Sequence, residues 1–346
     1  MEKSNKHLSS IQEKTLTKQG YRIIGNHSAV KICNWTRNMI RGKGGCYKYA
    51  FYGIRSHQCL QMTTSMYCAN RCKFCWRGLK APVSKQWYGN IDSPKEIIEQ
   101  SIKAQINLLQ GNKGNKEANK QFIKEMENIR HVALSLTGEP ITYPKINEII
   151  KEFHKRKIST FLVTNAQFPE EIKNIDNITQ LYLSIDAPNK ELLKKIDSPL
   201  FPDFWERMLS SLDILKTKNY RKCIRLTLIK DENIEDIKGY ANLINRGEPD
   251  FIEIKSYMWV GDSQKSYSIK NMPNMKEVKD FTDNLLKLLP EYEFAAEHIP
   301  SRVTLIIKKS LNKKQFIDFN KFFNLIESKS QFIAEDYSSK VMMTNN

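Results

Sequence analysis

The sequence lacks long hydrophobic runs. Its apolar stretches, such as 161–163 (FLV), fall far short of the roughly 18 residues that a membrane-spanning helix needs. The first ten residues, MEKSNKHLSS, contain no apolar segment like that of a secretory signal peptide. We therefore expect a cytoplasmic protein with no membrane segment. With 346 residues, of which 40% are hydrophobic and 10% aromatic, general disorder and small disulfide-stapled scaffolds are also excluded.

Acidic residues are scarce at the start of the chain. The first 90 residues contain only Glu2 and Glu13 against 16 Lys and Arg residues, and so hold 14 of the 17 net positive charges. A cationic segment of this kind favours a polyanionic partner, because neutralising phosphates releases counterions. The alternative is a solvated lysine-rich surface, which predicts a more even spread of charge.

Cysteine is concentrated in one segment. Six of the seven cysteines fall within 43 residues, and only Cys223 stands apart. Cytosolic thiols stay reduced, so this clustering is more typical of metal binding than of disulfides. The last three form a C-x3-C-x2-C run, and three thiolates can hold a 4Fe–4S cluster that keeps one iron open to a small chelating molecule. Structural zinc prefers four ligands, so this spacing suits zinc poorly. The six are Cys33, Cys46, Cys59, Cys68, Cys72 and Cys75.

The C-x3-C-x2-C run, with Phe74 before its last cysteine, resembles the signature of the radical S-adenosylmethionine (SAM) superfamily. The resemblance implies a 4Fe–4S cluster at Cys68, Cys72 and Cys75, with SAM chelating the open iron. It further implies that one-electron reduction cleaves SAM to a 5′-deoxyadenosyl radical, which abstracts hydrogen from a substrate.

The three upstream cysteines, Cys33, Cys46 and Cys59, are spaced 13 residues apart twice. Three further thiolates suggest a second metal centre, although ordinary buried cysteines are the alternative. The two triplets and the basic N-terminal segment together resemble the archaeal-type tRNA 4-demethylwyosine synthase family. That resemblance implies an auxiliary 4Fe–4S cluster at the upstream trio. It also implies that Lys48, two residues after Cys46, forms a Schiff base with pyruvate.

The same resemblance implies the reaction and its partners. The substrate is N1-methylguanosine at position 37 in the anticodon loop of tRNA-Phe, which is condensed with pyruvate to the tricyclic base 4-demethylwyosine. No flavodoxin-like domain precedes the cysteines, so we expect an external electron donor such as flavodoxin or ferredoxin, and a monomer. Aromatic residues among the basic ones are candidates for stacking on the RNA. They are Trp35, Tyr47, Tyr49, Phe51, Tyr52, Trp76, Trp87 and Tyr88.

Two alternatives come from other functional classes. A radical SAM maturase acting on a peptide can also carry auxiliary clusters, but its extra cysteines usually follow the barrel, whereas here they precede it. A non-catalytic RNA-binding protein with structural zinc predicts colourless protein that contains zinc. The enzyme predicts brown, oxygen-sensitive protein that contains iron and sulfide.

After the cysteines, short β-rich runs alternate with amphipathic helical stretches, which is typical of βα units around a parallel sheet. One helix is predicted to begin with Ser93 as N-cap, Pro94 in the first turn and Glu96 closing a capping box. Cys223 falls in a strand, where we expect an inert small hydrophobe. Strands are expected near 60–66 and at 131–136, 159–164, 180–185, 222–229, 250–256 and 302–308.

This pattern predicts an α/β fold: a partial (β/α)6-type radical SAM barrel with an N-terminal cluster-binding extension. We expect the extension at 1–60, the barrel at 61–310, and a C-terminal helix and tail at 311–346.

Polar residues follow three of the expected strands, where ligands collect in α/β folds. Gly138 and Glu139 resemble the superfamily segment that holds the SAM amino group, and the residues after the next two strands are candidates for SAM ribose and carboxylate contacts. These are Thr164, Asn165, Ser184 and Asp186. Each short segment is also an ordinary turn sequence. The sequence leaves open whether Arg225, Thr227 and Lys255 face the site, and whether Lys255 contacts ligand or forms a structural salt bridge.

Overall fold

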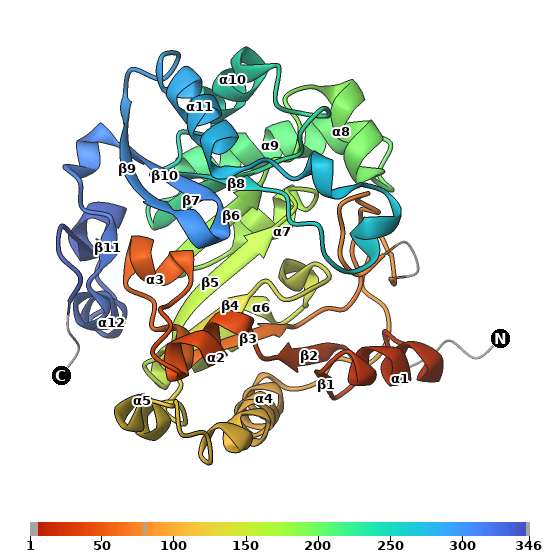
Figure 1. The fold of residues 1–346 in the computed structure, drawn as a ribbon, viewed down its shortest axis with the longest axis vertical. Helices are drawn as coiled ribbons and strands as arrows, with labels where there is room; N and C mark the ends of the chain where they lie inside the picture. The colour runs from red at the N-terminus through yellow and green to blue at the C-terminus, as the bar shows by residue number, and fades with distance from the viewer. Residues whose placement is uncertain (1–5, 79–80, 344–346) are drawn as a thin grey trace.

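The computed structural model describes residues 6–78 and 81–343, and its centre is a ten-stranded sheet (Figure 1). The strand order is β1-β2-β3-β4-β5-β6-β7-β8-β10-β9. Strands β3 to β8 are parallel and adjacent in chain order, whereas β1, β2, β10 and β9 pair antiparallel at the two edges. The strands are β1 Tyr21–Ile24, β2 Ser28–Lys31, β3 Cys59–Thr63, β4 His131–Leu134, β5 Ser159–Thr164, β6 Gln180–Ser184, β7 Arg221–Leu228, β8 Phe251–Ser256, β9 Tyr292–His298 and β10 Val303–Lys308.

Six adjacent parallel strands in an open sheet confirm the predicted partial (β/α)6-type barrel. All seven expected strands are present, because strands covered on both faces are mainly apolar; six of them are parallel and the seventh, β10, is antiparallel. The edge strands β1, β2 and β9 were not predicted. β9 reads YEFAAEH and is partly exposed along most of its length, so it carries no buried-strand pattern.

At least one helix follows each parallel strand, and these helices cover the outer face of the sheet (Figure 1). The connecting helices are α4 Pro94–Leu109, α5 Lys120–Glu125, α6 Ile146–Lys155, α7 Pro169–Asn174, α8 Lys190–Asp197, α9 Phe204–Thr217, α10 Ile237–Gly247 and α11 Met275–Leu286. Within the described residues, no helix is both long and apolar enough to cross a membrane.

Helix α4 begins where the sequence predicts, with Ser93 as N-cap and Pro94 in the first turn. The Ser93 hydroxyl accepts from the Glu96 backbone N–H at 3.3 Å and donates to the Glu96 carboxylate at 3.0 Å. The predicted capping box is therefore wrong in one detail. Glu96 closes onto the serine hydroxyl and not onto the backbone N–H of the N-cap residue.

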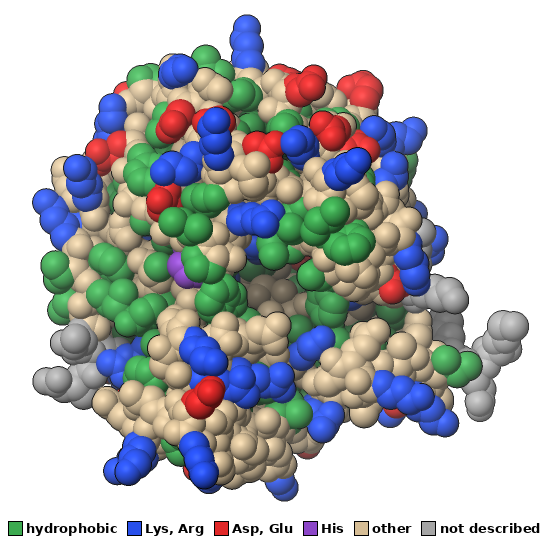
Figure 2. All heavy atoms as spheres, in the orientation of Figure 1, with side chains coloured by type: hydrophobic (Ala, Val, Ile, Leu, Met, Phe, Trp, Pro, Cys, Tyr) green, Lys and Arg blue, Asp and Glu red, His purple; other side chains and the backbone are tan. Residues whose placement is uncertain are grey.

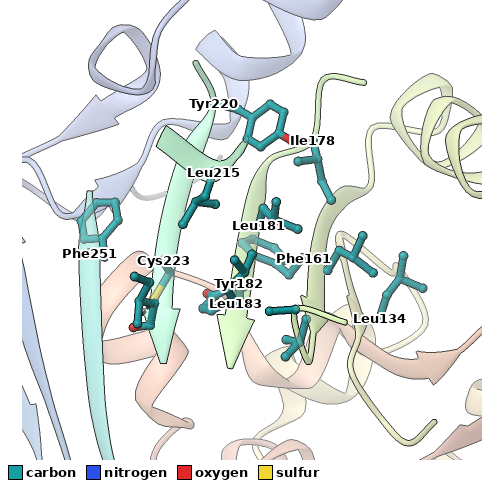
Figure 3. Close-up of a cluster of buried hydrophobic side chains, with 14 of the residues drawn as sticks. Leu134, Phe161, Ile178, Leu181, Tyr182, Leu183, Leu215, Tyr220, Cys223 and Phe251 are labelled. Atoms are coloured by element: carbon teal, nitrogen blue, oxygen red, sulfur yellow. Dashed lines mark hydrogen bonds between the residues drawn. The ribbon is translucent and has the colours of Figure 1, made fainter. Parts of the chain in front are cut away.

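The core lies between the sheet and its helices. Figure 3 shows Phe161, Tyr182 and Phe251 on neighbouring strands, with Leu215 of α9 on the adjacent helix. Cys223 of β7 is fully buried among them and is one of the free thiols.

In Figure 1, α2 and α3 of the N-terminal segment lie in front of the sheet, whereas α1 lies at its lower edge beside β1 and β2. It contains α1 Ser10–Lys18, α2 Asn34–Ile40 and α3 Tyr47–Tyr52, and α3 ends at Gly53 with a φ of 83°. The Tyr52 hydroxyl donates to the carboxylate of Glu253 on β8 at 2.8 Å, which ties α3 to the sheet.

At the other end of the chain, the C-terminal segment packs against the amino-terminal ends of the parallel strands. It contains the short antiparallel pair β11 Phe316–Ile317 and β12 Ser338–Ser339, and the helix α12 Phe319–Glu327. The Tyr337 hydroxyl accepts from the Arg221 backbone N–H at 2.8 Å and donates to the Thr179 carbonyl at 2.9 Å. Because Tyr337 is fully buried, the C-terminal segment forms part of the core.

Candidate active site

A cavity of about 210 Å³ lies at the carboxyl ends of the parallel strands. It brings together residues that are distant in the sequence, because the ends of parallel strands meet at one edge of a sheet. All nine residues predicted for the SAM site line it: Cys68, Cys72, Cys75, Gly138, Glu139, Thr164, Asn165, Ser184 and Asp186.

The three-cysteine loop is fixed by backbone hydrogen bonds to the end of α8. The Arg71 N–H donates to the Asp197 carbonyl, and the Lys73 N–H to the Ile196 carbonyl, each at 2.9 Å. Burial raises the pKa of Cys68 to about 12 and that of Cys72 well above its ordinary value. Buried neutral thiols of this kind lose their protons when a metal coordinates them.

The six clustered cysteines are all free thiols. Among the described residues, no group of three His, Cys, Asp or Glu side chains is close enough to hold a metal ion. A 4Fe–4S cluster separates its cysteine sulfurs by the width of the cluster, whereas the ligands of one ion must converge on a single point.

Glu139 lines the cavity and is only 2% exposed. One carboxylate oxygen accepts from the Asn165 backbone N–H at 3.1 Å, and the other, Oε1, has no partner in the described structure. Burial raises the pKa of Glu139 to about 8. Gly138 precedes it with a φ of 65°, and a Cβ there would lie 2.0 Å from the Ser65 carbonyl oxygen, so this turn requires glycine.

Two further polar residues line the cavity. Asp186 is 5% exposed, its Oδ1 has no partner among the described residues, and burial raises its pKa to about 6. The Ser184 hydroxyl accepts from the Arg225 guanidinium at 2.9 Å. Unpartnered carboxylate oxygens of Glu139 and Asp186 fit a ligand with an amino group and hydroxyl groups, which describes SAM.

Asn165 takes part both in an ordinary turn and in the wall of the SAM cavity, the two alternatives that the sequence left open. Its side-chain oxygen accepts from the Gln167 backbone N–H at 3.1 Å, as in an ordinary turn. Its amide nitrogen lies 3.4 Å from the Cys68 sulfur, inside the cavity.

Arg77 is a site residue that the sequence analysis missed. It lines the cavity, donates to the Met66 carbonyl at 3.1 Å and forms a hydrogen bond with Cys75. Burial alone would lower its pKa, but the nearby Cys75, Cys68 and Cys72 raise it, so the guanidinium offsets the negative charge of the thiolates. Its position two residues after Cys75 was the available signal.

The upstream cysteines form a second group. Cys33 is the N-cap of α2, Cys46 is the N-cap of α3, and Cys59 is the first residue of β3. Burial is the main cause of the raised pKa values of Cys33 and Cys59. The negative charge of Cys46 raises both pKa values further, and the charge of Cys33 also raises the pKa of Cys59. All three thiols are therefore near one another, although they come from three separate elements.

Lys48 projects from the first turn of α3 over the sheet. Its Nζ lies 4.4 Å from the centroid of the Tyr182 ring on β6 and 6.0 Å from that of Phe161 on β5. Its charge also lowers the pKa of the Cys33 and Cys59 thiols, so it adjoins the second cysteine group. The amine thus lies against an aromatic surface beside three thiols.

Glu253 was also missed, although a lone acid in the apolar run FIEI (251–254) was a signal. It is fully buried, and burial raises its pKa against the opposing effect of Lys48 and Arg225.

The structure also corrects the proposed stacking residues: Phe51 and Tyr52 are fully buried and cannot stack on RNA.

The face seen in Figure 1 is hollowed near its centre, and Lys and Arg side chains border the hollow (Figure 2). Elements of the basic N-terminal segment, α2, β1 and β2, lie along its lower side in Figure 1. Asp and Glu side chains gather mainly in the upper part of this face (Figure 2). The exposed surface around the hollow is therefore suited to a polyanion.

Comparisons with known proteins agree with this geometry. Residues 62–244 match the radical SAM superfamily and residues 246–308 match the family described as wyosine base formation. A solved structure, that of TYW1 with a lysine-pyruvate adduct bound, is 35% identical, with a TM-score of 0.79 over 88% of this chain and 97% of that one.

Among curated proteins, the S-adenosyl-L-methionine-dependent tRNA 4-demethylwyosine synthase of Oryza sativa subsp. japonica is 48% identical over 95% of this chain. The TYW1 protein of Homo sapiens, which carries the same description, is 45% identical over 94% of it. The chain spans about half the length of these relatives, 52% of the first and 46% of the second.

Proposed function

We propose that this chain, which belongs to the TYW1 family within the radical SAM superfamily, is a tRNA 4-demethylwyosine synthase. It condenses N1-methylguanosine at position 37 of tRNA-Phe with pyruvate to form 4-demethylwyosine. Membership of the radical SAM superfamily implies SAM and a 4Fe–4S cluster. The second cluster and pyruvate are part of this proposal.

One observation carries the proposal most directly. Lys48 lies beside the second cysteine group with its amine against the Tyr182 ring, and a relative has been solved with a lysine-pyruvate adduct. Lys48 is partly buried, and an amine held against an aromatic ring is suited to forming a Schiff base with a ketone. We therefore assign Lys48 as the residue that attacks pyruvate.

The remaining site residues have distinct tasks. Cys68, Cys72 and Cys75 hold the SAM cluster, and Cys33, Cys46 and Cys59 hold the auxiliary one. When bound, the first cluster and SAM supply a carbon-centred radical for the N-methyl group, which has no acidic proton that a side-chain base could remove.

The wall of the cavity positions SAM. Glu139 accepts a hydrogen bond from the SAM amino group through Oε1, and Asp186 accepts one from a ribose hydroxyl through Oδ1. Gly138, Thr164, Asn165 and Ser184 complete the contact surface. Both carboxylate oxygens are buried acceptors that gain a partner when SAM binds.

The proposed partners follow from the reaction. The anticodon loop of tRNA-Phe binds over the cationic hollow, with base 37 extruded into the barrel. An external one-electron donor such as flavodoxin or ferredoxin reduces the SAM cluster, and the chain acts as a cytoplasmic monomer. The similarity to tRNA 4-demethylwyosine synthases favours tRNA over the peptide substrate of the alternative maturase.

The test is nucleoside mass spectrometry of methylated tRNA-Phe after anaerobic incubation of reconstituted protein with SAM, pyruvate and dithionite. We expect 4-demethylwyosine from the wild type and at least a 100-fold lower rate from Lys48→Ala. The matched control is Lys216→Ala, which removes an exposed lysine on α9 that pairs with Glu248 and should leave the rate within about twofold.

Two outcomes contradict the proposal. If Lys48→Ala forms product at a near wild-type rate with both clusters filled, the role of Lys48 is wrong. If the wild type cleaves SAM and contains two clusters but forms no tricyclic base, the tRNA reaction is wrong and the peptide alternative gains weight.

A further inference from the structure

The interior of the barrel carries more positive than negative charge around one buried carboxylate. Glu253 lies at the centre, and the charges of Lys48 and Arg225 both lower its pKa. The charge of Glu253 in turn raises the pKa of Lys255, so this lysine adjoins the same carboxylate. Asp186 is a second acid near Arg225, and both residues line the SAM cavity.

These cations have unused hydrogen-bonding capacity. Arg225 donates to the Ser184 hydroxyl at 2.9 Å and forms a hydrogen bond with Tyr47, while its guanidinium has five N–H groups. Lys255 donates to the Ser301 carbonyl at 3.2 Å, and its ammonium has three N–H groups. Among the described residues, neither cation has a carboxylate within ion-pairing distance, so the structural salt bridge considered for Lys255 is absent.

The position of Arg225 relates this surplus charge to Lys48. Arg225 pairs across the sheet with Glu253 on β8 and with Ser184 on β6, two residues after Tyr182, whose ring Lys48 contacts. Arg225 also bonds to Tyr47, the residue next to Lys48 on α3, and both cations act on Glu253. In a 2-oxo acid the carboxylate is bonded directly to the ketone carbon. A 2-oxo acid attacked by Lys48 must therefore place its carboxylate within a few ångströms of that amine. A cation at that distance without a carboxylate partner of its own, such as Arg225, can bind this carboxylate.

We propose that Arg225, supported by the charge of Lys255, binds the carboxylate of the 2-oxo acid that reacts with Lys48. This inference rests on the proposed function and adds the residues that select the co-substrate. The planar guanidinium matches a carboxylate in two parallel hydrogen bonds, which a lysine cannot provide. Lys255 adds attraction without needing the same geometry.

The reaction involves two other anions, an RNA phosphate and the carboxylate of SAM, whose cavity Arg225 also lines. The trapping experiment below omits SAM so that the two carboxylates are separated, and the position of the site disfavours the phosphate. Arg225 and Lys255 are strand residues of β7 and β8 inside the barrel, next to a fully buried carboxylate. A nucleotide that enters base first leaves its phosphate at the mouth, where the exposed cations lie. A small carboxylate is the anion that reaches this depth.

The test compares pyruvate with methyl pyruvate, which has the same ketone but no negative charge. Reconstituted holoprotein is incubated anaerobically with either compound and without SAM, so that effects on the SAM cavity do not enter. Borohydride reduces the imine to a stable amine, and intact-protein mass spectrometry gives the concentration for half-maximal trapping. We expect Arg225→Gln to raise this concentration at least tenfold for pyruvate and less than twofold for methyl pyruvate.

Two further variants keep the test decisive. Lys255→Met should raise the half-maximal concentration of pyruvate about three- to tenfold, and provides the answer if Arg225→Gln fails to fold. Arg246→Gln, at an exposed arginine paired with Asp213, should change neither compound. Iron content equal to that of the wild type confirms that a variant retains both clusters.

The outcomes separate the inference from the function on which it rests. A wild type that traps no pyruvate overturns both. A wild type that traps pyruvate, with Arg225→Gln and Lys255→Met unchanged or weakened equally for both compounds, overturns only the carboxylate site. Unchanged trapping together with weaker binding of tRNA-Phe assigns the two cations to RNA and also overturns it.

Discussion

Replacing Lys255 with methionine should stabilise the protein at neutral pH, although it weakens the proposed carboxylate site. Lys255 is partly buried, and burial, followed by the charge of Arg225, lowers its pKa from 10.5 to about 8. The folded chain therefore holds its proton less tightly than the unfolded chain does. A difference of about 2.5 between the two pKa values corresponds to about 3 kcal/mol of lost stability at any pH below 8.

The net gain from Lys255→Met is smaller than this full amount. The variant leaves the Ser301 carbonyl without its donor, which costs about 1 kcal/mol, so about 2 kcal/mol remains at pH 7. For a chain of this length that corresponds to a rise of about 3 °C in melting temperature. As the pH rises from 8 towards 10.5 the unfolded chain also loses its proton, so the gain should fall to near zero by about pH 9.5.

The assay is thermal melting of wild type and variant at pH 7 and pH 9.5, at one scan rate, with Lys276→Met as an exposed control that should change little. A lower melting temperature of Lys255→Met at pH 7 would refute the reasoning. So would a gain of the same size at both pH values, because the ammonium would then have compensating partners in the folded state.

Three other predictions concern the cluster and its loop. Cys72→Ala should halve the iron content, from about eight atoms to about four per chain, as measured by iron and sulfide analysis. Cys223→Ala should leave the iron content unchanged, because that thiol lies in the core. Arg77→Gln should lower the midpoint potential of the SAM cluster by roughly 50–100 mV at unchanged iron content, because a cation near the thiolates favours the reduced cluster. An unchanged potential in a redox titration would contradict this prediction. Gly138→Ala should lower the free energy of unfolding by more than about 3 kcal/mol, because the added Cβ clashes with backbone atoms. Gly42→Ala, also at positive φ but in open space, should lower it by only about 1 kcal/mol. Equal losses in denaturant titrations would show that the clash is relieved.

The sequence predicted the parallel strands well and the sheet edges poorly, for one physical reason. A strand buried on both faces is mainly apolar or β-branched and carries few charges, as in 159–164 (STFLVT), and that run can be recognised without a structure. β9 lies at an edge and is partly exposed, so polar residues are tolerated and no pattern marks it. The cysteine spacing was equally informative, because one short loop delivers all three thiols of the SAM site.

The direction of side chains on those buried strands was not available from sequence. A strand with one solvent-exposed face reveals which face is inside, but β7 and β8 are buried along most of their length, so their alternation of charged and apolar residues does not show which face meets the helices. Arg225, Glu253 and Lys255 could therefore have pointed to the helices or into the barrel. Only the packing of α3 against the sheet showed that they lie beside Lys48.

The sequence by itself determined the chemistry that the chain can carry: two sets of three thiols, a lysine two residues from one of them, and an open parallel sheet to hold them. The tertiary structure decided which groups meet. Glu139, Asn165 and Asp186 share one cavity because parallel strands end at the same edge, and Lys48 lies over Tyr182, 134 positions later in the chain, because α3 packs on the inner face of the sheet. Contacts of this range depend on how elements pack, which local residue patterns do not specify.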